Sequence, residues 1–395
     1  MKKRIKLPLL ARIIIAIALG IGLGLVLPLP AVRVFVTFNS IFSHFLQFLI
    51  PLIIIGLITP AISDIGKSAG KLLLITTIIA YGDTVFSGYL SYFTSSNIFP
   101  MLINHGQGVE KIAEAKALEP FFTINIPPLV DVMSALVTAF TVGLGIAFFG
   151  SKTLKAGFDE FKDIVAKTIE VVLIPLLPLY IFGIFLEMSH TGQAWHVLNV
   201  FIAIIGVIFA LHIFLLVLQY CIAGIITHRN PFRLLWNMLP AYFTALGTSS
   251  SAATIPVTLK SSLKNNVSEG IASFVVPLCA TIHLSGSCLK IVACAVALML
   301  MTGTPFDIGM FTGFILMLGV MMVAAPGVPG GAIMAALGVL QSILGFDAQQ
   351  QALMIALYIT MDSFGTACNV TGDGAIALII DKINSKKEKK IINQA

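Results

Sequence analysis

Four polar residues near the end of a strongly apolar chain could bind cations or a polar ligand. Asp362, Thr366, Asn369 and Asp373 follow one another at spacings of four, three and four residues in the stretch MDSFGTACNVTGDG. At about 100° per residue they fall on one face of a helix. The stretch holds no basic residue, and a carboxylate at the centre of a bilayer costs roughly 2.5–3.5 kcal/mol. We therefore expect a metal ion, a substrate ammonium or protons beside them.

Two other interpretations of this stretch stay open. The carboxylates could be structural and capped by neighbouring backbone, without any ligand. The segment NVTGDG at 369–374 could also interrupt the helix and free carbonyl oxygens for Na⁺, since hard oxygen ligands suit Na⁺ better than they suit a transition metal.

The composition indicates a polytopic membrane protein. Of the 395 residues, 57% are hydrophobic and only 11% are charged, whereas soluble proteins carry about 25% charged residues. The net charge of +6 comes from basic residues in loops and tails, so it does not indicate a nucleic-acid partner. The five cysteines are odd in number and lack CxxC spacing, which predicts small buried side chains and not disulfides or a metal site.

Eight apolar runs are long enough to predict transmembrane helices. They lie at about 7–27, 35–62, 71–94, 126–150, 164–188, 197–227, 271–303 and 350–380. An even number of spans places both termini on one face, and that face carries most of the lysine and arginine residues. The excess of positive charge predicts cytoplasmic termini in an inner or plasma membrane, with membrane lipid as the surrounding partner.

Two further apolar stretches, 235–258 and 308–345, are broken by serine, glycine and proline in TALGTSSSAATIPVT and VAAPGVPGGAIM. Non-helical backbone at membrane depth occurs only where protein buries it or where it lines a wet cavity. We predict two re-entrant helical hairpins, the first entering from the cytoplasm and the second from outside; two kinked ordinary helices are the alternative. Paired interruptions of this kind indicate a transporter binding site.

Three motifs resemble those of the dicarboxylate/amino acid:cation symporter family, the glutamate transporter homologues. They are NVTGD at 369–373, TSSSAATIP at 248–256 and GVPGGAIM at 327–334, in the same order and with similar spacing. The resemblance implies an all-α polytopic membrane protein with eight transmembrane helices, two re-entrant hairpins and an elevator mechanism in a homotrimer. Scaffold helices would lie in 1–70 and 96–190, and the transport domain in 71–95, 191–232 and 233–395, ending in a basic cytoplasmic tail.

The resemblance also implies a set of site residues. Asp362 would bind the substrate ammonium, and Asn369 the substrate carboxylate. Further substrate contacts would be Ser249, Ser250, Ser251, Ser287, Gly327, Val328, Gly330, Gly365 and Thr366. Ligands of Na⁺, the expected coupling ion, would be Cys279, Thr281, His283, Asn369 and Asp373.

The chain departs from the family pattern at the substrate and ion positions. Members that carry acidic substrates have an arginine where this chain has Gly365, which predicts a neutral amino acid as substrate.

The family motif Asn-Met-Asp-Gly-Thr is replaced by HLSGS at 283–287. The aspartate and asparagine of one sodium site are therefore missing, and we expect fewer Na⁺ ions than in the family. We expect Asp83 with His283 or Lys290 to replace that ion by a fixed ion pair or a proton. The alternative is a Lys290 that snorkels to an interface and a His283 that is an ordinary core residue.

The expected function is Na⁺-coupled symport of a neutral amino acid by a protein that is not an enzyme. Alternatives are an obligate amino acid exchanger, a proton-coupled carrier of another small carboxylate and a passive anion pore. A remote alternative is an intramembrane serine hydrolase, with a nucleophile in GTSS at 247–250 and His283 as its base.

Overall fold

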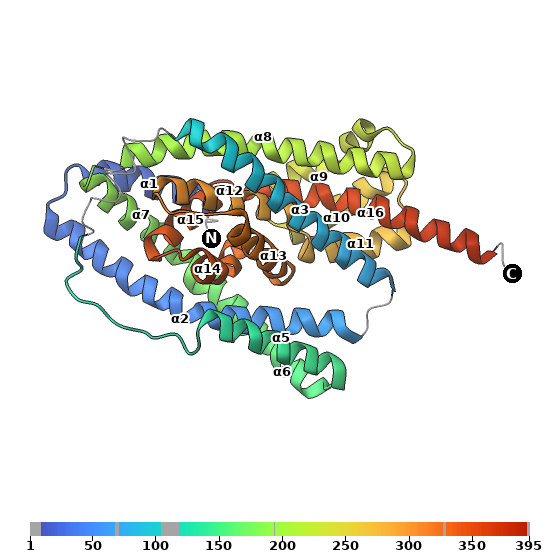
Figure 1. Cartoon of the computed structure of the whole chain (residues 1–395), viewed down its shortest axis with the longest axis horizontal. Coiled ribbons are helices and arrows are strands. Elements are labelled where there is room, and N and C mark those ends of the chain that lie inside the picture. Colours follow the sequence, from blue (N-terminus) through green and yellow to red (C-terminus); the bar gives the residue numbers. More distant parts are fainter. Residues whose placement is uncertain (1–8, 68–70, 104–117, 193, 327–328, 393–395) are drawn as a thin grey trace, which may run out of the picture.

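The computed structural model describes residues 9–67, 71–103, 118–192, 194–326 and 329–392. Every regular element in these ranges is helical, which confirms the predicted all-α class (Figure 1). The elements are α1 (Leu9–Gly24), α2 (Leu29–Lys67), α3 (Lys71–Leu102), α5 (Val132–Phe149), α6 (Lys152–Thr168), a π-helical turn η1 (Ile169–Leu173), α7 (Ile174–His190), α8 (Ala194–Thr227), α9 (Pro231–Thr248), α10 (Ser251–Lys264), α11 (Glu269–Ile282), α12 (Ser285–Met301), α13 (Ile308–Ala324), α14 (Gly331–Leu344), α15 (Ala348–Thr360) and α16 (Asp362–Ile392).

Seven helical segments of the described chain are long and apolar enough to cross a membrane, by length and composition. They are Leu29–Ser63, Leu72–Leu102, Val132–Phe149, Lys152–His190, Val197–Thr227, Glu269–Met301 and Asp362–Ser385. The first predicted span, α1, has only 16 residues, fewer than the ~20 that a bilayer needs. The predicted count of eight spans therefore stays a prediction. The α11–α12 and α16 windows are each 89% buried, against 33–61% for the others, so these two segments form the interior of the molecule.

The two broken apolar stretches fold as helix pairs. Helix α9 packs against α10, and α13 packs against α14. Their arms have 14 to 18 residues, or about 21–27 Å at 1.5 Å per residue, which is less than the ~30 Å of a hydrocarbon core. Paired helices of this length support the prediction of hairpins over that of kinked full spans. The tip residues Gly327 and Val328 lie outside the described residues.

Two of the predicted continuous helices are interrupted. The last one breaks at Met361, so that α15 ends at Thr360 and Asp362 is the first residue of α16. The suggestion of a break in NVTGDG is wrong, because α16 runs without interruption through 369–374. A second break separates α11 from α12 at His283 and Leu284. Neither break contains proline or glycine, which explains why the sequence pattern did not show it.

The helices pack as two groups. Helices α1, α2, α5, α6 and α7 pack mainly on one another, with α2 against α5, α6 and α7 and with α1 against α7. In the second group α16 contacts α8, α9, α10, α11 and α12, and α3 lies against α12 and α13. Figure 1 shows α2, α5 and α6 along one long side of the molecule and α8 along the opposite side. The second group therefore encloses the buried α11–α12 and α16 segments.

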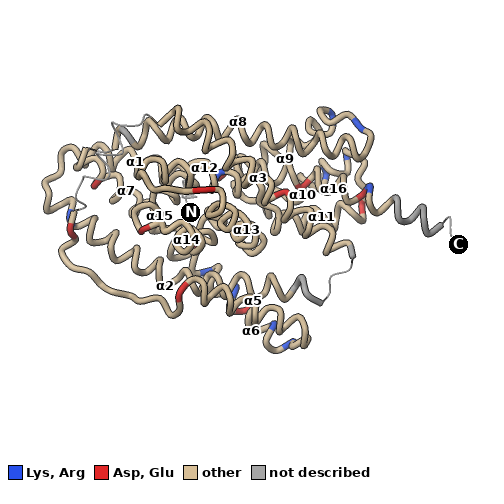
Figure 2. Tube along the Cα trace, viewed as in Figure 1, with Lys and Arg blue, Asp and Glu red and all other residues tan. Residues whose placement is uncertain are grey.

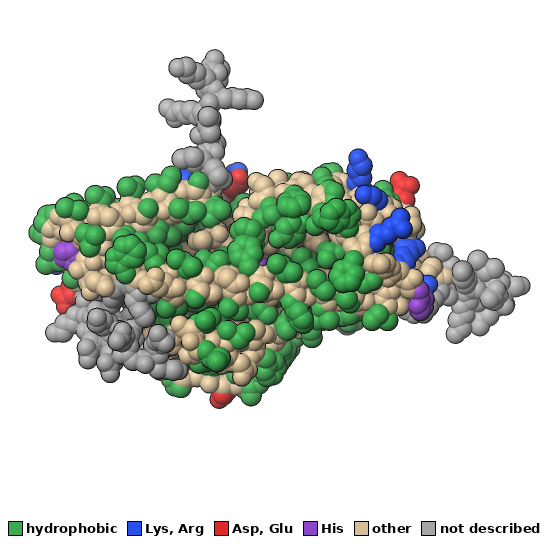
Figure 3. Space-filling model, turned by 90° about the horizontal axis from the view of Figure 1, so that it is seen from above, with side chains coloured by type: hydrophobic (Ala, Val, Ile, Leu, Met, Phe, Trp, Pro, Cys, Tyr) green, Lys and Arg blue, Asp and Glu red, His purple; other side chains and the backbone are tan. Residues whose placement is uncertain are grey.

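The described surface has the character of a membrane protein. Hydrophobic side chains cover most of the face seen in Figure 3. Large exposed hydrophobic side chains of the described chain include Phe148, Phe214 and Trp236. Lysine and arginine side chains gather toward the end of the molecule that carries the C-terminus (Figures 2 and 3). The apolar face and the basic end are the distribution expected of a protein with one basic cytoplasmic side.

Candidate functional site

Four interruptions of the helical chain meet at one small pocket. Its walls come from the turn between α9 and α10, the break between α11 and α12, the residues on either side of 327–328 in the second hairpin and the junction of α15 with α16. Each interruption exposes backbone groups that a continuous helix would use internally. The pocket has a volume of about 20 Å³, which is room for little more than one water. A larger ligand can enter only after one of these segments moves.

The structure brings together many of the residues that the sequence predicts to bind substrate. Residues of the predicted site that line the pocket are Ser249, Ser251, Thr281, Ser287, Asp362, Thr366 and Asn369. Ser250 does not line it, because its hydroxyl accepts a hydrogen bond from the Ala253 N–H at 3.3 Å and caps α10. Gly330 reaches the site through its N–H group, 2.8 Å from Asp362 Oδ2. That these residues bind substrate stays a prediction.

A buried ion pair stands at the start of α16. Lys290 Nζ lies 3.2 Å from Asp362 Oδ1 and 3.3 Å from the Met361 carbonyl oxygen. It also lies 3.5 Å from the centre of the Tyr358 ring. The Lys290 side chain is 0% exposed, so it does not snorkel toward an interface. A buried cation needs these partners because an unpaired charge away from water costs several kcal/mol.

The glycine at position 365 makes room for this lysine. A Cβ atom on Gly365 would lie 2.7 Å from Lys290 Nζ and 2.9 Å from Lys290 Cε, closer than real side-chain contacts allow. The sequence interpretation took Gly365 to mean that the pocket lacks a base at this place. The structure corrects that premise, because the ammonium group of Lys290 occupies the space.

A second, largely buried cluster joins α3, α8, α12 and α16 around His283. The two ring nitrogens of His283 contact two carboxylates: Nδ1 is 2.8 Å from Asp373 Oδ1, and Nε2 is 2.7 Å from Asp83 Oδ2. Gln219 donates from Nε2 to Asp83 Oδ2 at 2.6 Å and to Ser285 Oγ at 3.2 Å. Asp83 therefore pairs with His283 and not with Lys290, which decides between the two partners left open by the sequence. An imidazole between two carboxylates is the arrangement that a protonated ring satisfies, with both N–H groups donating.

The side chains of two predicted sodium ligands, Asp373 and Asn369, have hydrogen-bond partners in this structure. The carboxylate of Asp373 faces the His283 ring, whose Cε1 would also lie 2.8 Å from a Cβ on Gly372. The side-chain oxygen of Asn369 accepts the N–H groups of Gly286 at 2.8 Å and Ser287 at 3.2 Å. A Na⁺ ion at Asp373 would therefore compete with the His283 ring for Oδ1. That these residues bind Na⁺ stays a prediction.

The other two predicted ligands have separate surroundings. Cys279 is fully buried and does not line the pocket. The Thr281 hydroxyl donates to the Leu278 carbonyl at 2.7 Å and lines the pocket beside the second hairpin. Thr281 and Asn369 are therefore the members of the predicted set that line the pocket.

Sequence reasoning missed two residues that contact the charged groups. Tyr358 lies beneath the Lys290 ammonium, and its hydroxyl is 3.0 Å from Ser287 Oγ. Gln219 bridges Asp83 and Ser285 from α8. A lone glutamine in the apolar run 197–227 was a usable signal, because polar side chains inside membrane helices usually serve a site.

The hydrolase alternative lacks its base. Both ring nitrogens of His283 bond to aspartates, so neither can take a proton from a serine in the first hairpin.

The fold and the pocket define a multi-pass membrane protein with a small polar site enclosed by broken helices, as in a carrier.

Comparison with known proteins identifies the family. Residues 9–383 match the profile of the sodium:dicarboxylate symporter family, and the chain belongs to this family of transporters. It is 30% identical over 265 residues to "Excitatory amino acid transporter 3" of Mus musculus, covering 66% of this chain and 50% of that protein. It is 28% identical over 275 residues to "Excitatory amino acid transporter 4" of Mus musculus, covering 67% and 48%. The chain thus spans about half the length of the curated relatives it matches.

Replacing Gly365 by alanine tests whether the Lys290 side chain needs the space that glycine leaves at this position. The new methyl group meets Lys290 Nζ and Cε, so we expect Gly365→Ala to lower the free energy of unfolding by about 1–3 kcal/mol, as overpacking of a core does. Thermal unfolding of the purified protein measures the change. Gly206→Ala is the matched control, because a Cβ there meets nothing within 4 Å; equal melting points for both variants would refute the packing argument.

Replacing His283 by asparagine tests whether its ring fills a cation site. The change leaves Asp83 and Asp373 without their shared partner, and breaking a buried ion pair costs about 3–5 kcal/mol. Because oxygen ligands are then free, we expect Na⁺ to raise the melting point of His283→Asn more than that of the parent protein, by mass action. His44→Asn is the control, since His44 Nδ1 contacts only the Ser40 carbonyl. A Na⁺ response equal to that of the parent would contradict the assignment.

Proposed function

We propose that this chain is a secondary active transporter that couples the entry of a small neutral amino acid to a cation gradient, with Na⁺ as the expected ion. The buried pair of Lys290 and Asp362 at the pocket carries this proposal. It supplies one positive and one negative charge at the place where the family resemblance puts the substrate.

A neutral amino acid matches this pair because it is a zwitterion. Its ammonium can take a place on Asp362 and its carboxylate a place beside Lys290, so that the number of buried charges of each sign stays balanced. An acidic amino acid would add one further negative charge. The described lining contains no lysine, arginine or histidine, and Lys290, which lies beside Asp362, is already paired with that carboxylate. A buried unpaired charge is costly. The balance of buried charges thus supports a neutral amino acid as the substrate. It replaces the earlier argument from the missing arginine at position 365.

A second candidate substrate is a small carboxylate without an amino group. Both oxygens of Asp362 are already bonded, one to Lys290 and the other to the Gly330 N–H. In this alternative the Lys290 ammonium takes the place of the substrate ammonium permanently. The substrate then needs only its carboxylate recognised, by the hairpin serines and the Asn369 amide.

The second hairpin is the proposed gate. A cavity of about 290 Å³ lies between α2, α6 and the α3–α11–α13 region, and it shares Thr281, Ala325 and Pro326 with the small pocket. Lys162 of α6 also lines this cavity. Movement of the second hairpin near Pro326 would widen the connection between the pocket and the cavity and admit a ligand that the small pocket cannot hold.

The wider mechanism is proposed from the family and from the two packing groups. Helices α1, α2, α5, α6 and α7 would be the static scaffold of a homotrimer in the plasma membrane, with both termini cytoplasmic. The group around α16 would move as the transport domain of an elevator. Of the predicted sodium ligands, we retain Thr281 with carbonyls of the second hairpin as the coupling site, and expect fewer ions than the full family pattern has.

Ligand-induced stabilisation is the experiment that tests the substrate. In the presence of Na⁺, we expect small neutral amino acids to raise the melting point of the purified protein, because a ligand that binds only the native state stabilises it by mass action. Aspartate and glutamate should have a much smaller effect. Stabilisation by the acidic amino acids alone would refute the charge-balance argument.

Two variants separate the candidate substrates. Asp362→Asn should abolish stabilisation by amino acids if their ammonium binds there, whereas an amine-free carboxylate should still bind. Lys290→Met should weaken both kinds of ligand. Asp307→Asn is the matched control, because Asp307 only caps α13 and asparagine caps helices equally well. Unchanged amino acid binding in Asp362→Asn would exclude the zwitterion model.

A further inference from the structure

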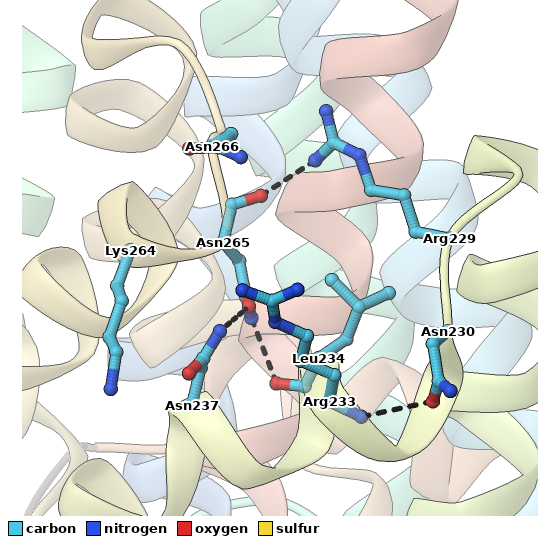
Figure 4. A pocket seen from close by; sticks show the side chains of 8 residues that line it. All are labelled: Arg229, Asn230, Arg233, Leu234, Asn237, Lys264, Asn265 and Asn266. Atoms are coloured by element: carbon cyan, nitrogen blue, oxygen red, sulfur yellow. Dashed lines mark hydrogen bonds between the residues drawn. The ribbon is translucent and has the colours of Figure 1, made fainter.

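A second pocket, of about 400 Å³, lies at the base of the first hairpin and shares no lining residue with the small pocket beside Asp362. It is formed where the turn between α8 and α9 meets the turn between α10 and α11 (Figure 4). Three cationic side chains line it: Arg229 before α9, Arg233 in the first turn of α9 and Lys264 at the end of α10. No aspartate or glutamate is among its lining residues.

Two of these cations have no partner in the part of the chain that the structure describes. Arg229 Nη1 donates to the Asn265 carbonyl oxygen at 2.7 Å, which fixes the direction of its guanidinium. The side chains of Arg233 and Lys264 make no such hydrogen bond or ion pair. The nearby Asp381 carboxylate accepts from the Ser268 N–H at 3.1 Å and from the Ser268 hydroxyl at 2.6 Å, so it is engaged outside this pocket. Three cationic side chains thus line one pocket whose lining residues include no carboxylate.

The asparagines around the pocket make its walls rigid. Asn265 is only 2% exposed; its amide donates to the Leu234 carbonyl at 2.9 Å and accepts from Asn237 Nδ2 at 2.7 Å. Figure 4 shows these bonds joining Leu234 and Asn237 of α9 to Asn265, behind the Arg233 guanidinium. A basic cytoplasmic face explains the presence of arginine and lysine at this end, but it does not require that three of these side chains line one pocket.

The surroundings indicate which anion reaches the pocket. Phe232 and Trp236 are 66% and 70% exposed on α9, one turn apart and beside Arg233 and Asn237. One face of α9 is therefore apolar and open to lipid, while the adjacent face lines the basic pocket. Exposed tryptophan beside cations is typical of the membrane interface, where anionic headgroups attract basic clusters.

We propose that this pocket binds the phosphate group of an anionic phospholipid, with Arg229, Arg233 and Lys264 as its ligands and with Phe232 and Trp236 against the acyl chains. Guanidinium groups bind phosphate oxygens in pairs, and an ammonium adds a point charge. The bound lipid would tie the turn before α9 to the turn after α10. The first hairpin would then be anchored at its base, while its tip lines the substrate pocket.

Thermal unfolding of the full chain in lipid tests this proposal without any transport measurement. We expect dioleoyl phosphatidylglycerol vesicles to raise the melting point by several degrees over dioleoyl phosphatidylcholine vesicles. The double variant Arg233→Gln/Lys264→Gln should lose most of this difference while it melts like the parent in phosphatidylcholine. The control Lys260→Gln/Lys382→Gln removes the same charge outside the pocket lining and should keep the full difference.

Two outcomes would overturn the assignment. If the pocket variant keeps the phosphatidylglycerol effect to the same extent as the control, the pocket is not the lipid site. If inorganic phosphate at millimolar concentration gives the same stabilisation and phosphatidylglycerol adds nothing, the site binds a soluble phosphate and the lipid source is wrong. Retention of one phosphatidylglycerol in native mass spectrometry by the parent, and its loss in the pocket variant, would support the lipid.

Discussion

Charges that are buried away from water must be paired, and this requirement organises the centre of the protein. Lys290 with Asp362, and His283 with Asp83 and Asp373, are the two clusters that meet it. The helix interruptions serve the same requirement. The Gly330 N–H bonds to Asp362, and the Gly286 and Ser287 N–H groups bond to Asn369, so the backbone donors freed by the breaks are satisfied by the polar side chains of α16.

Much of this arrangement could be predicted from local sequence. Asp362, Thr366, Asn369 and Asp373 are separated by whole helical turns, and all four lie in the uninterrupted helix α16. Serine, glycine and proline inside apolar runs correctly indicated the two helix pairs. These features depend on residues close together in the chain, where the period of a helix is enough to place them.

The partners of the buried charges could not be predicted in the same way. Lys290 and Asp362 are 72 residues apart, and His283 and Asp83 are 200 residues apart. Only the packing of α3, α11, α12 and α16 therefore determines which charged side chains pair. The breaks at His283 and at Met361 contain no glycine or proline. Their cause is tertiary, because side chains from other helices bind the freed backbone groups there.

The contact between Gly365 and Lys290 has a consequence for how such a pocket can evolve. A Cβ atom at position 365 would meet the end of the Lys290 side chain, and loss of the lysine while glycine remains leaves Asp362 without its cation. We therefore expect each single exchange to be harmful and the double exchange to restore both packing and charge. Such a relation between two positions is reciprocal sign epistasis. A lineage that switches between a lysine-type and an arginine-type pocket must cross that barrier, and the residues at 290 and 365 are expected to covary among relatives.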